Sequence, residues 1–285
     1  MKRAAAAFAV LLGCAVEAHA QSPTLFVADK TAPLGTVAPV PTLADDDAGA
    51  DDGAGTVTPV LLTMLGAALP QNVEIAGLEL STTQPAALAL DTTAPLVGLG
   101  APADPRDVVR WDPNTSTYSL YFDGAAAGVP ANARIDAVSF APSGALRLSF
   151  DTTVSLPIVG TVDDEDLVEV VAGGFVMVFD GSANGVPANL DLDAASRPNE
   201  TSAQLLLSFD DSGVIAGIPF DDEDVLLFDP GLGTWTLFAD SSLSDPVDWP
   251  GADLVALPEP GAATSLLAGV TLLAGLARRA RTPVV

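Results

Sequence analysis

Between about residue 24 and residue 257 the chain is built from apolar runs of five or six residues, separated by Gly, Pro, Asp and Asn. Runs of this length, bounded by turn-forming residues, predict β-strands rather than helices. No stretch of this region shows a helical period of apolar residues. The 23 prolines and 25 glycines of the chain fit a loop-rich, all-β body.

The runs recur with a period of about 58–62 residues. The clearest copy relates 121–124 and 128–132 to 178–181 and 185–189, with an offset of 57 in both pieces. Aspartates mark two places in each repeat, the first at Asp29, Asp91, Asp151 and Asp210 and the second at Asp47, Asp107, Asp166 and Asp224. The pattern predicts four units, at 24–82, 86–142, 145–197 and 204–257.

Each unit is predicted to hold four short strands, which in the fourth unit are 204–209, 224–228, 234–238 and 253–257. Four-stranded units repeated at this length favour a small β-propeller. Closure into a ring would hide the sheet edges of a protein that has no disulfide. An open β-solenoid or a pair of β-sandwiches are the alternative architectures.

The first twenty residues have the pattern of a secretory signal peptide. Lys2 and Arg3 precede an apolar core at 4–16, and Ala18 and Ala20 frame a small-x-small cleavage site for signal peptidase. Cleavage there would start the mature chain at Gln21. In an alternative interpretation residues 11–14 resemble a lipobox, which would make Cys14 a lipidated N-terminus.

The last thirty residues contain a tripeptide, an apolar segment and a basic cluster. Pro258, Glu259 and Pro260 precede 17 apolar or small residues at 261–277, and Arg278, Arg279 and Arg281 follow. Seventeen residues are at the short end of a transmembrane helix, and the arginines would stay in the cytoplasm. This order resembles the PEP-CTERM sorting tail of Gram-negative bacteria. A plain membrane anchor without processing is the alternative.

The resemblance implies a sequence of locations and partners. An exosortase would cut near the tripeptide, so the protein would pass from an inner-membrane precursor to the cell surface or extracellular matrix. Association with exopolysaccharide and biofilm material is also what the resemblance implies. The repeat itself resembles one of large secreted bacterial proteins, through 191–194, 222–225 and 234–238, and that repeat implies no catalytic role.

Composition excludes several kinds of chemistry from the mature chain. Cys14 and His19 are the only cysteine and histidine, and both lie in the leader. A Ser-His-Asp triad, a cysteine nucleophile, a His-ligated zinc and a disulfide are therefore excluded after cleavage. Residues 22–257 hold six basic and 35 acidic side chains, a net charge of −29 that repels nucleic acid and anionic membranes.

Two acidic runs are the candidate metal ligands. Ca²⁺ is bound by six to eight oxygens, several of them from clustered carboxylates. The expected calcium ligands are Asp163, Asp164, Glu165, Asp166, Asp221, Asp222, Glu223 and Asp224. The alternative is that these residues form turns and solvate the strand ends. Asp123, Asp180 and Asp240 each end a strand and are interpreted as turn caps.

Nothing in the sequence marks a catalytic residue, and we expect a non-enzymatic protein. Carboxylate pairs can hydrolyse glycosides, so a carbohydrate-active enzyme on a propeller scaffold is one alternative. A purely structural spacer is the other. Trp111 and Trp235 are expected in the core, whereas Trp249 lies in a loop between Asp248 and Pro250 and could stack on a sugar.

Overall fold

The computed structural model describes residues 69–70, 73–79, 85–112, 114–222 and 224–240 with their side chains. For six further strands it describes the backbone: β1 (Thr24–Ala28), β2 (Ala32–Pro33), β3 (Thr42–Leu43), β4 (Ala48–Asp51), β5 (Val57–Pro59) and β22 (Ala252–Ala256). The predicted signal peptide 1–20 with Cys14, Ala18 and Ala20, and the predicted tail 258–285 with Pro258, Glu259, Pro260, Arg278, Arg279 and Arg281, lie outside the described residues.

Four antiparallel sheets of four strands form the body, and the first has the order β22-β1-β4-β5. The second sheet is β6 (Ile75–Glu79), β7 (Ala87–Leu90), β8 (Val108–Asp112) and β9 (Thr117–Phe122). The third is β10 (Ile135–Phe140), β11 (Leu146–Phe150), β14 (Leu167–Val171) and β15 (Gly174–Phe179). The fourth is β16 (Ala194–Ser196), β17 (Leu205–Ser208), β20 (Val225–Asp229) and β21 (Thr234–Ala239).

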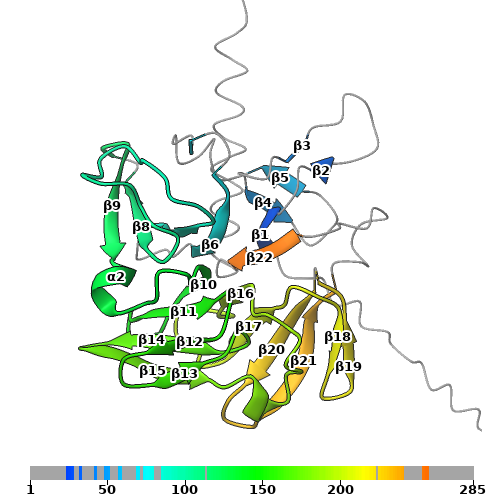
Figure 1. The fold of residues 1–285 in the computed structure, drawn as a ribbon. Coiled ribbons are helices and arrows are strands. Elements are labelled where there is room, and N and C mark those ends of the chain that lie inside the picture. Colours follow the sequence, from blue (N-terminus) through cyan, green and yellow to red (C-terminus); the bar gives the residue numbers. More distant parts are fainter. Residues whose placement is uncertain are drawn as a thin grey trace, which may run out of the picture.

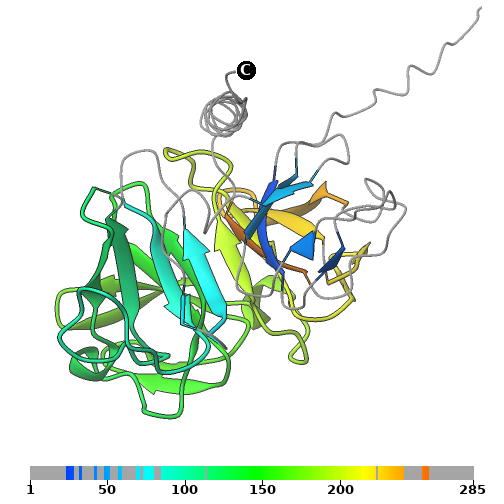
Figure 2. The same cartoon turned by 90° about the horizontal axis from the view of Figure 1, so that it is seen from above.

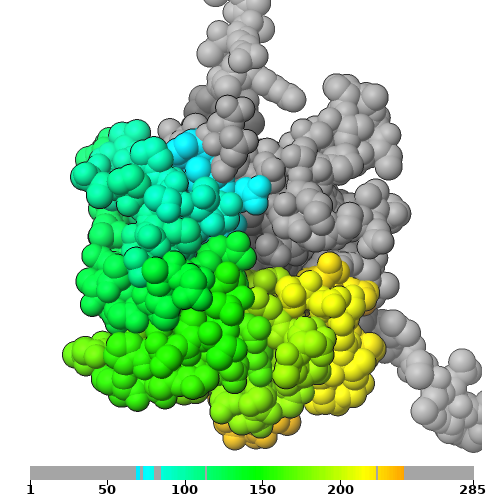
Figure 3. All heavy atoms as spheres, in the orientation of Figure 1, coloured from blue at the N-terminus to red at the C-terminus, as the bar shows by residue number. Residues whose placement is uncertain are grey.

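The sheets are the blades of a closed ring. Strand β6 contacts β10, β10 contacts β16, β16 contacts β22, and β22 contacts β6. Figure 1 shows the four sheets arranged around these innermost strands. The chain is therefore a four-bladed β-propeller, as the repeats predict. In the space-filling view the second blade adjoins the third, and the third adjoins the fourth (Figure 3).

Blades and sequence units are out of phase by one strand. The last strand of each unit becomes the innermost strand of the next blade, so the predicted strand 253–257 lies in the first blade and not in the fourth. There β22 pairs antiparallel with β1, with Leu25 opposite Ala256. Figure 2 shows these blue and orange strands side by side. The two ends of the body thus close the ring with one hydrogen-bonded sheet.

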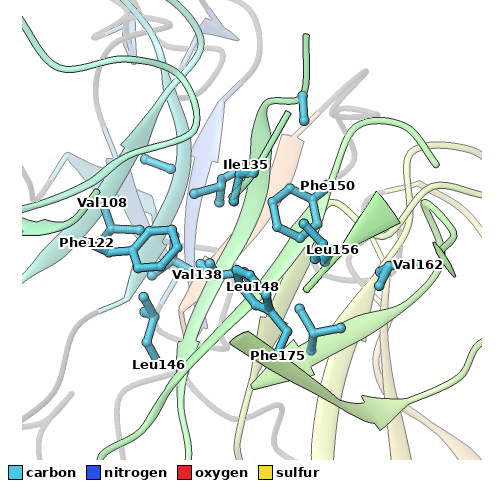
Figure 4. Close-up of a cluster of buried hydrophobic side chains, with 14 of the residues drawn as sticks. Val108, Phe122, Ile135, Val138, Leu146, Leu148, Phe150, Leu156, Val162 and Phe175 are labelled. Atoms are coloured by element: carbon cyan, nitrogen blue, oxygen red, sulfur yellow. The ribbon is translucent and has the colours of Figure 1, made fainter. Parts of the chain in front are cut away.

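Apolar side chains fill the spaces between neighbouring blades. Figure 4 shows the cluster between the second and third blades, where Val108 and Phe122 meet Leu148, Phe150 and Phe175. Trp111 and Trp235 are buried in the two other clusters, which confirms their predicted core positions. Close packing near the axis needs a glycine, because a Cβ on Gly77 would lie 2.5 Å from the Asp136 carbonyl oxygen on the neighbouring innermost strand.

Short hairpins cover the outer strands of the third and fourth blades. They are β12 (Val154–Leu156) with β13 (Gly160–Val162), and β18 (Gly213–Ile215) with β19 (Ile218–Phe220). At the tip of the first hairpin the Pro157 carbonyl accepts a hydrogen bond from the Phe175 amide of β15. This contact protects part of an exposed sheet edge. The next residue, Ile158, is 70% exposed and has a φ of 72°, a strained value for a β-branched side chain.

Helix is almost absent from the described residues. It is limited to α2 (Gly124–Ala127) and the 3₁₀ turn η1 (Ser182–Asn184). Accordingly, the part of the chain that the structure describes contains no helix long and apolar enough to cross a membrane.

Candidate functional site

The first acidic run, 163–166, is a structural turn in the third blade, held by its last residue, Asp166. The Asp166 carboxylate accepts one hydrogen bond from the Asp163 amide and one from the Gly181 amide, both at 2.9 Å. It thereby joins the turn before β14 to the turn after β15. Asp166 is buried, and burial raises its pKa while the two backbone hydrogen bonds lower it. A Cβ on Gly181 would lie 2.3 Å from Glu165 Cγ, so the partner amide must belong to glycine.

The same arrangement recurs in the neighbouring blades. Asp107 accepts hydrogen bonds from the amides of Asp104 and Gly124, at 2.9 and 3.0 Å. Asp224 accepts one from the Asp221 amide at 3.0 Å. The turn interpretation of the acidic runs is thus confirmed for Asp166 and Asp224, the last residue of each run.

The other members of the two runs point to several different partners. The Asp163 carboxylate accepts a hydrogen bond from the Thr153 hydroxyl at 3.0 Å. Glu165 is buried beside three aspartates, and burial is the main reason that its pKa rises to about 7. The Asp222 carbonyl accepts a bond from Ser208, and Glu223 lies outside the described residues. Within the described residues, neither run brings three carboxylates within 4.8 Å of one another.

The other series of recurring aspartates holds the innermost strands in place. The carboxylates of Asp91, Asp151 and Asp210 accept hydrogen bonds of 2.7–2.8 Å from the amides of residues 74, 134 and 191. Residues 74 and 134 directly precede the innermost strands β6 and β10, and residue 191 comes three positions before β16. Asp123 and Asp180 cap short turns by accepting bonds from the amides of residues 126 and 183, which confirms their predicted capping role.

A group of three carboxylates lies apart from these turns. One oxygen each of Asp136, Asp191 and Asp193 lies within 4.8 Å of the others. Asp136 is the second residue of β10, Asp193 directly precedes β16, and Asp191 lies two residues before Asp193, so two adjacent innermost strands bring the group together. The group therefore sits next to the propeller axis, between the third and fourth blades.

The electrostatics of this group are unfavourable without a cation. Asp191 Oδ1 is buried and accepts no hydrogen bond. Burial, and then the charges of Asp136 and Asp164, raise the pKa of Asp191 to about 8. Arg134 supplies a counter-charge, because its Nε lies 3.2 Å from Asp136 Oδ1 and 3.9 Å from Asp151 Oδ2. This arginine is thus shared between two carboxylates.

Oxygen ligands converging from separate carboxylates suit a hard divalent cation such as Ca²⁺, which would remove the repulsion between them. The sequence pattern did not predict this group, because its three aspartates do not form one contiguous acidic run. A weak signal was present, since 135–139 and 192–196 share the pattern apolar-Asp-Ala-apolar-Ser, counting Ala195 as apolar. Of the expected ligands only Asp164 comes near, because its carbonyl accepts the Leu192 amide.

A second buried polar group lies at the opposite ends of the innermost strands. Glu79 ends β6, and Ser196 ends β16 on the other side of the axis. Burial raises the pKa of Glu79 to about 8, although Arg197 and a hydrogen bond with Ser196 lower it. This group combines a carboxyl with a cation, so it is a less suitable metal site than the three aspartates.

Comparisons with known proteins identify no family for the chain. No protein-family model and no curated protein matches it. Among solved structures it is similar to YCF48 bound to D1 peptide, with 10% identity and a TM-score of 0.32 over 72% of this chain and 53% of that one. It is also similar to virginiamycin B lyase from Staphylococcus aureus, with 9% identity and a TM-score of 0.33 over 75% and 73%.

A further similarity is to the extracellular domain of a one-component system from B. thetaiotaomicron, with 10% identity and a TM-score of 0.33. That match covers 79% of this chain and 28% of the other. The chain thus spans about half of the YCF48 chain and a smaller part of the extracellular domain. Likenesses this distant say nothing about activity, and the fold assignment rests on the sheet topology.

Proposed function

We propose that this protein is a non-enzymatic, exported propeller that exosortase sorts to the cell surface or extracellular matrix. The observation that carries the proposal is the position of β22 relative to the sorting motif. Strand β22 closes the ring and ends at Ala256, and Pro258 follows after one residue. The propeller is therefore complete just before the tripeptide, and cleavage there would release a closed body.

The intact mass of the protein recovered from the cell surface tests this proposal. The expected product begins at Gln21 and ends between residues 257 and 260. Deletion of the exosortase should leave the full tail on a membrane-bound precursor. Substitution of Glu259 by Gln tests the tripeptide in the same way, and Glu17→Gln in the leader is the matched control. A cytoplasmic protein that keeps both the N-terminal leader and the C-terminal tail would refute the proposal.

Within this function, the carboxylates Asp136, Asp191 and Asp193 are proposed to bind Ca²⁺ and to connect the body to acidic exopolysaccharide. The buried, unpartnered oxygen of Asp191 supports this assignment. A bound Ca²⁺ retains open coordination positions, which sugar hydroxyls or carboxylates can fill. The negative body and a negative polymer would otherwise repel each other.

Cosedimentation with purified exopolysaccharide tests the bridging role. The protein should pellet with the polymer in Ca²⁺ and remain soluble in EGTA. The variant Asp193→Asn should lose this dependence, whereas Asp211→Asn, on an exposed residue outside the group, should retain it. Binding that is equal in Ca²⁺ and EGTA would refute the calcium-dependent binding of the polymer, but it would not bear on the proposed sorting by exosortase.

One observation favours a carbohydrate-active enzyme as a second candidate. Burial raises the pKa of Asp191 to about 8, which favours its protonated form, and its carboxyl lies next to that of Asp136. A protonated carboxyl beside an ionised one is the arrangement that glycosidases use. Release of new reducing ends from the polymer, abolished by Asp191→Asn, would support this candidate. Polymer that stays intact would exclude it for that substrate.

A further inference from the structure

Both ends of the propeller emerge from the same face of the ring. Strand β1 begins at Thr24, and its antiparallel neighbour β22 ends at Ala256. Leu25 and Ala256 are opposite each other in the register, so the two ends lie side by side. We call this side the terminal face. It also carries the connections from innermost to second strands and from third to fourth strands, at 113–116, 141–145, 172–173, 197–204 and 230–233.

The opposite side, the distal face, carries the connections that lead into the third strand and the innermost strand of each blade. In the described part of the chain these are 91–107, 123–134, 151–166, 180–193 and 209–224. They hold the acidic runs, the turn caps and most of the three-aspartate group. The repeat thus places the same kind of acidic connection on the same face in every described blade.

Charge is divided very unequally between the two faces. The distal connections and the residues directly beside them hold twenty acidic side chains against two arginines: Glu74, Asp91, Asp104, Asp107, Asp123, Asp136, Asp151, Asp163, Asp164, Glu165, Asp166, Asp180, Asp191, Asp193, Asp210, Asp211, Asp221, Asp222, Asp224 and Asp240, with Arg106 and Arg134.

The strands and terminal connections hold five acidic side chains against three arginines: Glu79, Asp112, Glu169, Glu200 and Asp229, with Arg110, Arg147 and Arg197. The formal charge is therefore −18 on the distal side and −2 on the rest of the described residues. Among the described residues, therefore, nearly all of the negative charge lies on the distal side, and the side from which the chain emerges is nearly neutral.

The sequence leaves little distance between this face and a membrane. Four residues, 257–260, separate the end of β22 from the apolar segment, and they span at most about 14 Å when fully extended. The polar headgroup layer takes up roughly 5–8 Å of this length. On the other side, three residues separate the predicted signal cleavage site from Thr24. Both predicted processing sites are close to the terminal face.

We propose that the anchored precursor stands with its terminal face against the anionic lipid surface and its acidic distal face pointing away. This rests on the proposed function, because it requires the tail to span the membrane. The short connection brings one face to the lipid, and electrostatic repulsion disfavours the face that carries −18. Asp136, Asp191 and Asp193 then lie toward the side of the body that faces away from the membrane before the tail is cut.

Single cysteines in the full chain test this orientation. With Cys14 replaced by Ala the chain has no other cysteine, so Ser143→Cys on the terminal face and Ser212→Cys on the distal face can be labelled separately. Both serines are exposed, so the two sites are matched. In spheroplasts without exosortase, both cysteines should react with a small maleimide. A maleimide with a long polyethylene glycol chain should label the terminal site at least an order of magnitude more slowly.

A linker provides the control. Insertion of a Gly/Ser linker of about 30 residues before Pro258, which spans roughly 30 Å, should make the two cysteines equally reactive. Equal reactivity without the linker, in a chain that resists alkaline extraction from the membrane, would overturn the orientation and leave the proposed function standing. A chain that alkali extracts would instead refute the membrane-anchored precursor itself.

Discussion

Removal of the Asp166 carboxylate tests whether the acidic runs are part of the scaffold. In Asp166→Ala the buried amide of Gly181 and the half-buried amide of Asp163 lose their acceptor. Each unsatisfied buried amide costs about 1–3 kcal/mol. The raised pKa shows that burial of the carboxyl already has a cost, which the substitution recovers. We therefore expect a net loss of about 3 kcal/mol in the free energy of unfolding.

In a body of this size such a loss lowers Tm by roughly 6–12 °C. Thermal unfolding of residues 21–257, followed by circular dichroism and calorimetry, measures it directly. The matched control is Asp180→Ala, which removes an exposed turn cap in the same blade and should cost about 1 kcal/mol. A change below about 1 kcal/mol in Asp166→Ala would refute the structural role and make residues 163–166 candidate calcium ligands again.

Three further predictions concern stability. Gly181→Ala should lower the free energy of unfolding by about 1–3 kcal/mol, because the new Cβ would contact Glu165. Gly100→Ala, where a Cβ meets nothing within 4 Å, should leave it unchanged, and chemical denaturation measures both variants. Ile158→Asn should stabilise the folded protein by about 1 kcal/mol, because Asn tolerates the positive φ at this position. An unchanged Tm would show that the Ile158 backbone is not strained. The pKa of Glu79 is about 8 in the folded state and 4.5 in the unfolded state. The contribution of Glu79 to stability is therefore largest below pH 4.5 and is lost as the pH rises toward 8. Glu79→Gln should flatten this part of the pH–stability curve, and a curve of unchanged slope would contradict the assignment.

The strands and their repetition could be predicted because both depend on local pattern. Short apolar runs between turn residues define the strands, and the aspartates that recur are those that hold turns, such as Asp166 and Asp210. The phase of the blades could not be predicted in this way. A repeat has no intrinsic beginning, and only the pairing of Leu25 with Ala256 shows that the ring is closed by its two ends.

The candidate site depended on a long-range contact that no local pattern reveals. Asp136 and Asp193 occupy similar positions in successive repeats, yet they meet because their innermost strands are neighbours at the axis. The contiguous run at 163–166 gave a stronger signal in the sequence, but its last residue is taken up by backbone amides. Recurrence thus marked the scaffold, whereas Asp191 stands at a position that holds Glu74 and Arg134 in the two preceding blades.

Calorimetric melting of residues 21–257 in Ca²⁺, in Mg²⁺ and in EGTA tests the central claim most directly. Wild type, Asp193→Asn and Asp163→Asn should be compared. The account predicts that Tm rises by several degrees in Ca²⁺ alone, that Asp193→Asn abolishes the rise, and that Asp163→Asn retains it. No rise in wild type, or a rise that Asp163→Asn abolishes and Asp193→Asn retains, would contradict the assignment of cation binding to the axis of the propeller.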